Sequence, residues 1–375
     1  MRENRLECYV FRAPTPHPIL TSFGAMNDRP AVFLRLFAPD GSWGWGEVFC
    51  NFPQSGAEHR ARLAETIFPA LISELDFSDP PAVRRELEKK TRRVAIQCGE
   101  PGPFSQVISA IDQAAWDMVA RRRGEPLWKV LAPQSSPFNR RVQVYASGLG
   151  PDRVVDHALE KRAEGYRAFK FKVGFGAARD LRNMQDLREA LGDDVMIMTD
   201  ANQAWEPSEA KLRISELEKF HPYWIEEPLA ADEPLADWKD LAAASKISLA
   251  AGENIRGEAN FEAAIASGAL GFIQPDVAKW GGISGCREVA LAAKKRAVMF
   301  CPHWLGGGVG LAASLHLRAA LGCEGLAEVD ANPNPLREEV FSPPLTRGWV
   351  ELTDAPGLGV EPDLVLLHKY RVSLR

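Results

Sequence analysis

From about residue 142 onward, short apolar segments alternate with amphipathic segments, and this alternation constrains the fold more than any other feature of the chain. The apolar segments predict eight strands, at residues 142–147, 168–173, 195–200, 223–226, 247–253, 272–276, 298–303 and 325–329. The amphipathic segments predict seven helices between them, at residues 151–164, 177–191, 207–219, 235–244, 258–267, 282–296 and 308–321. Strands that alternate with helices run parallel. Eight evenly spaced strands favour a closed (β/α)8 barrel over the alternative, an open doubly wound sheet.

The residues before about 130 have a different pattern. Residues 30–49 alternate apolar and polar side chains around a turn at residues 39–41, which predicts a β-hairpin. Three later segments have helical periodicity, at residues 57–75, 80–96 and 104–123. Together these elements predict an α+β domain in front of the barrel. The segment after residue 330 is rich in proline and glycine, and we expect it to pack back across the surface.

The composition argues against several classes of protein. With 45 basic and 50 acidic side chains the net charge is 45 − 50 = −5, and the pI near 5.9 argues against bulk electrostatic binding of nucleic acid. No apolar run reaches the ~18 residues of a membrane-spanning helix, and residues 1–5 are followed by no apolar signal core. The cysteines form no C-x-x-C pair, which predicts reduced thiols: Cys8, Cys50, Cys98, Cys286, Cys301 and Cys323. We therefore expect a cytoplasmic enzyme without a nucleic-acid or membrane partner.

A charged or titratable side chain ends seven of the eight predicted strands. These side chains are Lys172, Asp200, Glu226, Glu253, Asp276, His303 and Glu328. They recur at intervals that range from 28 residues (172 to 200) to 23 residues (253 to 276). Barrel enzymes carry their active sites at the C-terminal ends of the strands, so near-constant intervals predict one group per β/α unit on a single rim.

Asp200, Glu226 and Glu253 end three consecutive strands and are predicted to converge. Three carboxylates in one pocket repel one another strongly unless a cation lies among them. A ligand set made only of oxygen atoms suits a hard ion such as Mg²⁺. The alternative is that each acid caps the helix that follows it. That alternative explains a single acid well and three in succession poorly.

Lys170 and Lys172 are two residues apart on one strand, so they face the same side. Beside a metal and a second cation, Lys172 is expected to have a lowered pKa and to act as a base. The alternative for the lysine pair is a solvated edge strand.

Asp276 and His303 end adjacent strands, where the carboxylate would fix the imidazole tautomer and leave the other nitrogen facing the pocket. We therefore favour acid–base chemistry over a purely structural histidine.

Other features of the rim are less specific. Glu328 is a weaker candidate, because Asp330 lies two residues further on and competes for the same role. The glycine-rich residues 305–310 lack the Lys-Ser/Thr of a phosphate-binding loop. They predict a tight loop where backbone approaches the substrate, and an anion contact there stays open. Trp205 and Trp304 are expected on the rim, where they would line the pocket.

The ordered motifs Lys-x-Lys, Asp-x-Asn, Glu-Glu-Pro, Gly-Glu-Asn, Gln-Pro-Asp and Pro-His resemble the enolase superfamily. The lysine pair with the His–Asp dyad resembles its mandelate racemase subgroup. Residues 162–166 and 170–176 are similar to sugar-acid enzymes of that subgroup, which include acid-sugar dehydratases and galactarolactone cycloisomerase. The resemblance covers the whole chain, including the Gly-Trp-Gly-Glu of residues 44–47. It implies a TIM-like (β/α)7β barrel at 136–330, an α+β capping domain at 1–135, and a segment at 331–375 that packs back on the cap.

The resemblance also implies roles for individual residues. Mg²⁺ would be held by Asp200, Glu226 and Glu253. Lys172 and the His303–Asp276 dyad would be acid–base groups on opposite faces of the substrate, with Lys170 and Glu328 polarising its carboxylate. The residues expected to contact substrate are Asn202, Lys279, Trp304 and Phe23. The family usually forms homo-oligomers, dimers or octamers, and we expect one here.

These features predict an enzyme that abstracts the α-proton of a small hydroxy-carboxylate, an acid sugar, through an enediolate that a divalent cation stabilises. Loss of a β-hydroxyl, catalysed by a dehydratase, is the first choice. Racemisation and lactone cycloisomerisation are the alternatives within the superfamily. Dipeptide epimerases carry a lysine where this chain has Ala278, which argues against that branch. A non-catalytic, metabolite-binding barrel would lack a ligand or a base, and none is missing. Specificity is expected from residues 21–24 and 51–54.

Overall fold

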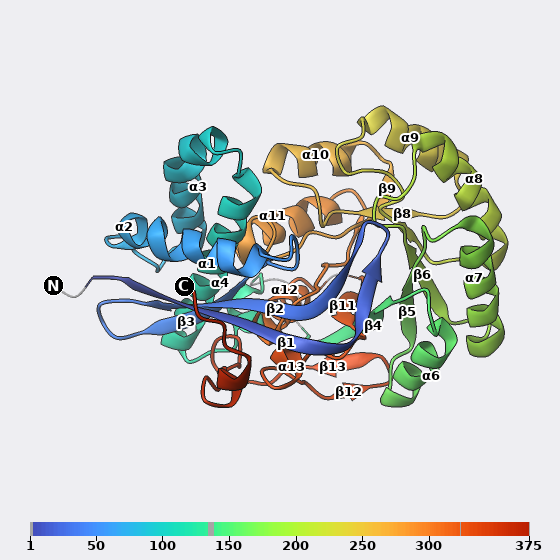
Figure 1. The fold of residues 1–375 in the computed structure, drawn as a ribbon. Coiled ribbons are helices and arrows are strands. Elements are labelled where there is room, and N and C mark those ends of the chain that lie inside the picture. The colour runs from blue at the N-terminus through green and yellow to red at the C-terminus, as the bar shows by residue number, and fades with distance from the viewer. Residues whose placement is uncertain (1–2, 134–138, 323, 375) are drawn as a thin grey trace.

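The computed structural model, which describes residues 3–133, 139–322 and 324–374, places a three-stranded antiparallel sheet and its helices beside a parallel barrel (Figure 1). The antiparallel strands lie in the order β1 (Arg5–Thr21), β2 (Gly24–Phe37) and β3 (Trp43–Val48). The helices that follow are α1 (Gly56–Thr66), α2 (Phe68–Ile72), α3 (Pro80–Gln97), α4 (Pro101–Arg123) and α5 (Leu127–Leu131). The predicted hairpin is confirmed, since Phe37 pairs with Trp43. We refer to residues 5–131 as the cap.

Two features of the cap differ from the sequence prediction. The single helix predicted over residues 57–75 is divided into α1 and α2. The division comes at Pro69, because proline has no amide hydrogen and its ring clashes with the preceding turn, so it is tolerated only in the first turn of α2. Strand β1 and helix α5 lie outside the predicted elements.

Among the described residues, eight strands form the barrel, each at its predicted place in the chain. They are β4 (Arg141–Leu149), β5 (Ala168–Lys172), β6 (Met196–Asp200), β7 (Ile225–Glu226), β8 (Leu249–Ala251), β9 (Leu270–Ile273), β10 (Met299–Phe300) and β11 (Ala327–Asp330). The helices between them are α6 (Val154–Glu164), α7 (Ala177–Leu191), α8 (Pro207–Leu217), α9 (Leu235–Ala244), α10 (Glu258–Ala266), α11 (Gly282–Lys294) and α12 (Gly308–Ala320). A short 3-10 turn, η1 (Glu218–Phe220), follows α8.

The parallel strands close into a ring, as predicted. Hydrogen-bonded neighbours follow the order β11, β4, β5, β6, β7, β8, β9 and β10. The ring closes where the Glu328 amide donates to the Pro302 carbonyl oxygen at 3.4 Å. Strand β10 is shorter than the predicted segment 298–303, because Pro302 has no amide hydrogen to continue the ladder.

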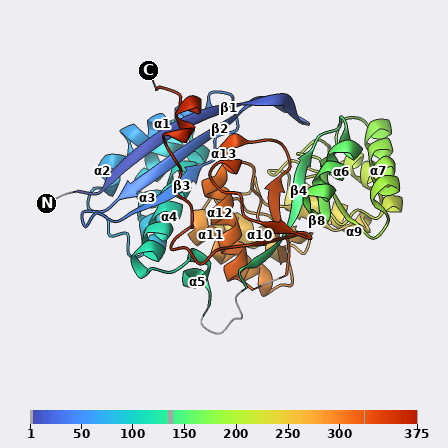
Figure 2. The same ribbon diagram turned by 90° about the horizontal axis from the view of Figure 1, so that it is seen from below.

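The segment after β11 returns toward the cap (Figure 2). It contains α13 (Pro335–Glu338), β12 (Leu345–Thr346), β13 (Trp349–Glu351) and η2 (Leu366–Tyr370). Strand β13 pairs antiparallel with the start of β4, and the Val372 amide donates to the Val10 carbonyl oxygen of β1 at 2.9 Å. The division of the chain into three parts stays a prediction, and its boundary at residue 135 lies outside the described residues, as does Cys323.

Strand β3, which contains the Gly-Trp-Gly-Glu motif, connects the cap to the barrel. A β-carbon at Gly46 would lie 2.0 Å from the Ala110 carbonyl oxygen, so glycine lets β3 pack directly on the backbone of α4. The buried Glu47 carboxylate then accepts hydrogen bonds from the Gly307 amide at 2.5 Å and the Gly310 amide at 2.8 Å. These amides lie at the N-terminus of α12, which favours an anion. The glycine-rich segment, for which an anion contact was left open, thus binds a carboxyl group of the protein itself.

A buried ion pair also joins the two parts. Arg29 of β2 and Asp330 at the end of β11 are only 2% and 1% exposed, and the guanidinium donates to the carboxylate. Asp330 also lies 3.4 Å from the Arg337 guanidinium. The Asp330 carboxylate thus takes part in the contact between the cap and the barrel.

Across the described ranges, no helix combines the length and apolar character that a membrane crossing needs.

Candidate active site

The interior of the barrel sets which side chains reach its mouth. One buried residue from each strand or its edge fills a layer inside the ring: Tyr145, Ala168, Met198, Trp224, Ala250, Phe272, Cys301 and Leu326. Side chains two residues apart on a strand point the same way. The next residues toward the C-terminal ends therefore also point inward, and they include Lys170, Asp200, Glu226, Gln274, His303 and Glu328. The period of two explains why the charged residues follow apolar ones.

Glu253 does not follow this period, because it lies three residues after Ala250. Strand β8 ends at Ala251, and Gly252 adopts a φ of +154°. A β-carbon at Gly252 would lie 2.5 Å from the Gln274 amide nitrogen, so only glycine fits this turn against β9. The turn brings the Glu253 side chain to the mouth, where its carboxylate lies 2.8 Å from the His303 Nε2 atom. Glycine in the Gly-Glu-Asn motif therefore positions the acid that follows it.

The two lysines of β5 are buried among carboxylates. The Lys170 ammonium lies 2.5 Å from Glu226 Oε1, 2.8 Å from Glu328 Oε1 and 3.8 Å from Asp200 Oδ2. The Lys172 ammonium lies 2.6 Å from Asp200 Oδ2. Burial opposes the charged form of Lys172, but the Asp200 carboxylate outweighs burial, and the pKa of Lys172 is raised. The expectation of a lowered pKa was made for Lys172 beside a bound metal, and it stays a prediction for the metal-bound enzyme.

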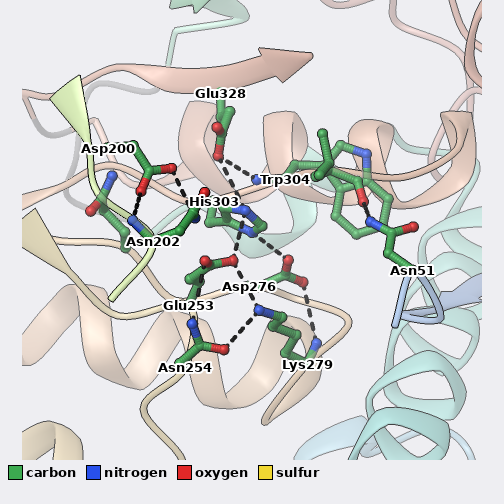
Figure 3. Close-up of polar contacts among 12 residues, drawn as sticks. Asn51, Asp200, Asn202, Glu253, Asn254, Asp276, Lys279, His303, Trp304 and Glu328 are labelled. Atoms are coloured by element: carbon green, nitrogen blue, oxygen red, sulfur yellow. Dashed lines mark hydrogen bonds and ion pairs between the residues drawn. The ribbon is translucent and has the colours of Figure 1, made fainter. Parts of the chain in front are cut away.

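His303 is held by a carboxylate on each side (Figure 3). Its Nδ1 atom lies 2.6 Å from Asp276 Oδ2, and its Nε2 atom lies 2.8 Å from Glu253 Oε2. The other Asp276 oxygen accepts hydrogen bonds from the Ala278 and Lys279 amides. Burial disfavours the imidazolium, yet Glu253 and Glu328 outweigh it and raise the pKa of His303 well above its ordinary value. Asp276 therefore orients the ring, and the imidazole proton is held toward the mouth of the barrel.

The three acids predicted to hold a metal are buried at neighbouring strand ends, with Asp200, Glu226 and Glu253 only 2%, 1% and 9% exposed. As their side chains stand, no cluster of three or more acidic, histidine or cysteine groups within the described ranges is arranged to hold a metal ion. Each acid is paired instead with a cationic side chain: Lys172, Lys170, and Lys279 with His303. The donor set nevertheless fits a hard divalent cation, because it is built of carboxylate oxygens and two of its members, Asp200 and Glu226, already share a positive charge, the Lys170 ammonium. Burial raises the pKa of Glu226 to about 7.

A cavity of about 710 Å³ opens above these residues, between the cap and the barrel. Lys172, Asn202, Glu253, Lys279 and His303 line it, and so does Phe23 from the turn between β1 and β2. The Ser22 hydroxyl donates to the Asn202 carbonyl oxygen at 2.8 Å, so this turn reaches the rim of the barrel. The Phe23 ring is 60% exposed and packs edge-on against Phe52, with 5.1 Å between ring centroids. The two cap loops expected to set specificity therefore meet over one cavity.

Two of the predicted contact residues, Asn202 and Lys279, line this cavity with polar side chains. The Asn202 amide nitrogen donates to Asp200 at 3.2 Å, while its buried Oδ1 atom has no hydrogen-bond partner among the described residues. The Lys279 ammonium lies 2.9 Å from Glu253 and 3.0 Å from the Asn254 side-chain oxygen (Figure 3). Lys279 also lies over the Phe49 ring, 4.5 Å from its centroid. Asn202 therefore offers an unpaired acceptor and Lys279 a positive charge at the cavity wall.

Trp304 and Glu328 lie beneath the cavity wall. The Trp304 indole is 1% exposed, and a β-carbon at Gly310 would lie 2.0 Å from it, so the glycine-rich segment makes room for the ring. The predicted contact of this indole with substrate is not supported by its position. The Trp304 backbone amide instead donates to Glu328 at 3.0 Å (Figure 3). Asp330 is engaged by Arg29, so Glu328 is the acid of β11 that faces the site.

Glu227 and Asn254 were given no role by the sequence analysis, yet they support the site. Glu227 is 1% exposed, and its two carboxylate oxygens accept hydrogen bonds from the Asn254 amide at 3.0 and 2.8 Å. Burial raises the pKa of Glu227 well above its ordinary value. The same Asn254 side chain accepts from Lys279. The signal was present, because both residues belong to the Glu-Glu-Pro and Gly-Glu-Asn motifs.

A closed parallel barrel with acids, lysines and a His–Asp dyad at its C-terminal rim, roofed by an α+β cap, defines a class of barrel enzymes. Residues 5–132 match the mandelate racemase / muconate lactonizing enzyme N-terminal domain family, and residues 153–365 match the enolase C-terminal domain-like family. The chain belongs to the mandelate racemase / muconate lactonizing enzyme family of the enolase superfamily. The resemblance inferred from the motifs is confirmed.

Three similar proteins place the chain further. It is 32% identical to D-galactarolactone cycloisomerase from Agrobacterium fabrum, over 92% of both chains. It matches the structure of a mandelate racemase/muconate lactonizing enzyme from Bordetella bronchiseptica RB50, with a TM-score of 0.92, 47% identity and 99% of both chains covered. It also matches a variant of L-talarate/galactarate dehydratase liganded with Mg and L-glucarate, with a TM-score of 0.85, 29% identity, and 99% and 93% of the chains covered.

Proposed function

We propose that this enzyme abstracts the α-proton of a hydroxy-carboxylate, an acid sugar, with the aid of Mg²⁺, and then eliminates water from the β-carbon. The observation that carries the proposal is that Lys172 and the Asp276-oriented His303 line one cavity from strands that are not neighbours. Two strands, β4 and β11, separate β5 from β10 on one side of the ring, and four separate them on the other. A substrate between Lys172 and His303 would present a different face to each.

The α-proton of a carboxylate is very weakly acidic, because its removal leaves two negative oxygens on an enediolate. Asp200, Glu226 and Glu253 would hold Mg²⁺, which supplies positive charge beside those oxygens. Lys170, with Glu328 2.8 Å from its ammonium, would polarise the substrate carboxylate. Lys172 would take the α-proton as the neutral amine, after its ammonium has left the Asp200 carboxylate and released a proton to solvent.

His303 would serve as the general acid. Its proton, held at Nε2 beside the cavity, would pass to the departing β-hydroxyl, and Asp276 would stabilise the ring throughout. Similarity to the talarate/galactarate dehydratase variant supports this choice. Lactone cycloisomerisation is the second candidate, favoured by 32% identity to D-galactarolactone cycloisomerase along 92% of the chain. Racemisation uses the same two opposed groups. A cytoplasmic location and a homo-oligomer, a dimer or an octamer, are further predictions.

Solvent deuterium exchange at the α-carbon, followed by NMR, tests the proposal. With Mg²⁺ and a panel of acid sugars, the wild-type chain is expected to give 2-keto products. His303→Asn should lose elimination but still exchange the α-proton through Lys172, whereas Lys172→Ala should lose both. A racemase would show exchange of only one enantiomer in His303→Asn, and a cycloisomerase would form its 2-keto product from a lactone, by ring opening without loss of water. His157→Asn and Lys161→Ala, outside the cavity, are the matched controls.

Two outcomes would contradict the proposed roles of the acid–base pair. Wild-type turnover in Lys172→Ala on every accepted substrate would show that Lys172 is not the base. Loss of all exchange in folded, metal-bound His303→Asn would show that the two residues do not act on opposite faces. Separately, retention of full activity after removal of divalent cations with a chelator would remove the role of Mg²⁺.

A further inference from the structure

The Gln-Pro-Asp segment after β9 contains a residue that the proposed function does not use. Gln274 is 1% exposed, and its side-chain amide donates to Glu226 Oε2 at 2.6 Å. The indole N–H of Trp224 donates to the same oxygen at 3.2 Å. The other oxygen, Glu226 Oε1, lies 2.5 Å from the Lys170 ammonium. The two oxygens of this carboxylate therefore have different partners.

These contacts fix the orientation of the carboxylate. The terminal torsion of a glutamate is intrinsically broad, but two donors from different strand positions hold Oε2 toward Gln274 and Trp224. Oε1 is then turned toward the Lys170 ammonium. That ammonium lies 2.5 Å from Glu226 Oε1 and 3.8 Å from Asp200 Oδ2. Both donors are neutral, so they orient Glu226 without compensating its charge. A lysine or arginine in their place would compete with a cation for the carboxylate.

We propose that Gln274 and Trp224 are positioning residues that present Glu226 Oε1 to a divalent cation. The inference rests on the proposed function, which makes Glu226 a metal ligand. It assigns a task to the glutamine of the Gln-Pro-Asp motif that is separate from the task of Asp276. Groups that orient metal ligands in this way typically contribute 10–100-fold to metal affinity.

Metal affinity, rather than turnover, tests the inference. Mn²⁺ binding to the full chain is followed by electron paramagnetic resonance, which reports both the dissociation constant and the symmetry of the bound ion. Gln274→Met keeps the length of the side chain without its N–H groups, and we expect it to weaken Mn²⁺ binding about 10–100-fold. Trp224→Phe removes one N–H and keeps an aromatic ring in the barrel, and a smaller loss is expected because Gln274 remains.

Tyr145→Phe is the matched control. Tyr145 lies in the same barrel interior, is fully buried, and its hydroxyl has no hydrogen-bond partner among the described residues. Its loss should leave the Mn²⁺ affinity and spectrum unchanged.

The outcomes are distinguishable. Wild-type affinity in Gln274→Met, even with a lowered melting temperature, would show that the glutamine only stabilises the barrel and would overturn the inference. If Gln274→Met does not fold, unchanged binding in Trp224→Phe would overturn it equally. Failure of the wild-type chain itself to bind Mn²⁺ or Mg²⁺ would overturn the proposed function together with this inference, and would be seen before any variant is made.

Discussion

At Glu253, one carboxylate joins the predicted metal set to the predicted acid–base set. It lies 2.8 Å from His303 and 2.9 Å from Lys279, while Gly252 supplies the turn that brings it there. Its two cationic partners hold this carboxylate in place. The same residue therefore helps to keep His303 protonated, since the charge of Glu253 is a main cause of the raised pKa of His303.

Glu253→Gln removes that charge and changes little else in size. We expect Mg²⁺ binding, measured by titration calorimetry, to weaken at least about 100-fold, because a metal ligand is worth no less than the groups that orient it. The pKa of His303, followed by NMR, should fall because its largest electrostatic partner is lost. The circular dichroism spectrum should stay that of the wild type. Glu258→Gln, an exposed acid in the first turn of α10, is the control. Unchanged Mg²⁺ affinity would exclude Glu253 as a ligand.

At the scale of elements, the glycine-rich segment shows how strand β3 and helix α12 depend on each other. Gly44 and Gly46 bring β3 against α4, and Glu47 then accepts the first amides of α12. The segment follows His303 directly in the chain, so this contact also anchors the loop that carries the histidine. The amides at the start of helix α12 thus donate to a carboxyl group of the cap, 260 residues away in the sequence.

This contact predicts a pH-dependent stability. Burial raises the pKa of Glu47 from 4.5 to about 8, above the value expected in the unfolded chain. Its contribution is therefore fully present below about pH 4.5 and is lost as the pH rises through about 8. The unfolding free energy of the wild type, relative to Glu47→Gln, should fall by at least about 1 kcal/mol between pH 5 and 9. Urea titrations at several pH values measure it, and a difference independent of pH would exclude Glu47 as the titrating group.

At the scale of the whole molecule, the Arg29–Asp330 pair joins cap and barrel across 301 residues of sequence. Both groups are almost fully buried, so Arg29 depends on Asp330 for compensation of its charge, while Asp330 is shared between Arg29 and Arg337. The pair lies beside the final strand of the barrel, two residues from Glu328. Loss of either partner would therefore disturb both the stability of the molecule and the seat of the cap.

Arg29→Met should destabilise the chain by about 3–5 kcal/mol, because it leaves a buried carboxylate short of a partner. The double variant with Asp330→Asn should recover part of that loss, and urea denaturation of the four species gives the coupling. Arg140→Met is the matched control: its ion pair with Glu351 has both side chains 47% exposed, and it should cost no more than about 1 kcal/mol. Equal losses for Arg29 and Arg140 would contradict the role assigned to the buried pair.

Much of the fold was predictable from local pattern. The order of strands and helices in the barrel depends on periodicity and on short-range signals, and helices α7 and α9 match their predicted limits. One charged group per strand end follows from the period of two and from the parallel direction of the strands. For the same reason, the sequence alone was sufficient to bring Lys172, Asp276 and His303 to one rim.

The partners of those groups depended on the tertiary structure. Each of those groups is paired with a residue from a distant part of the chain. Lysines of β5 lie beside Asp200 and Glu226, Glu47 accepts hydrogen bonds from the Gly307 and Gly310 amides, and Arg29 donates to Asp330. Periodicity reports which face a side chain occupies, and it carries no information on what lies opposite. Trp304 points away from the cavity because Gly306 and Gly310 leave room for its ring, a choice made by packing. The sequence therefore determined which chemical groups gather at the rim, and three-dimensional packing decided how they pair.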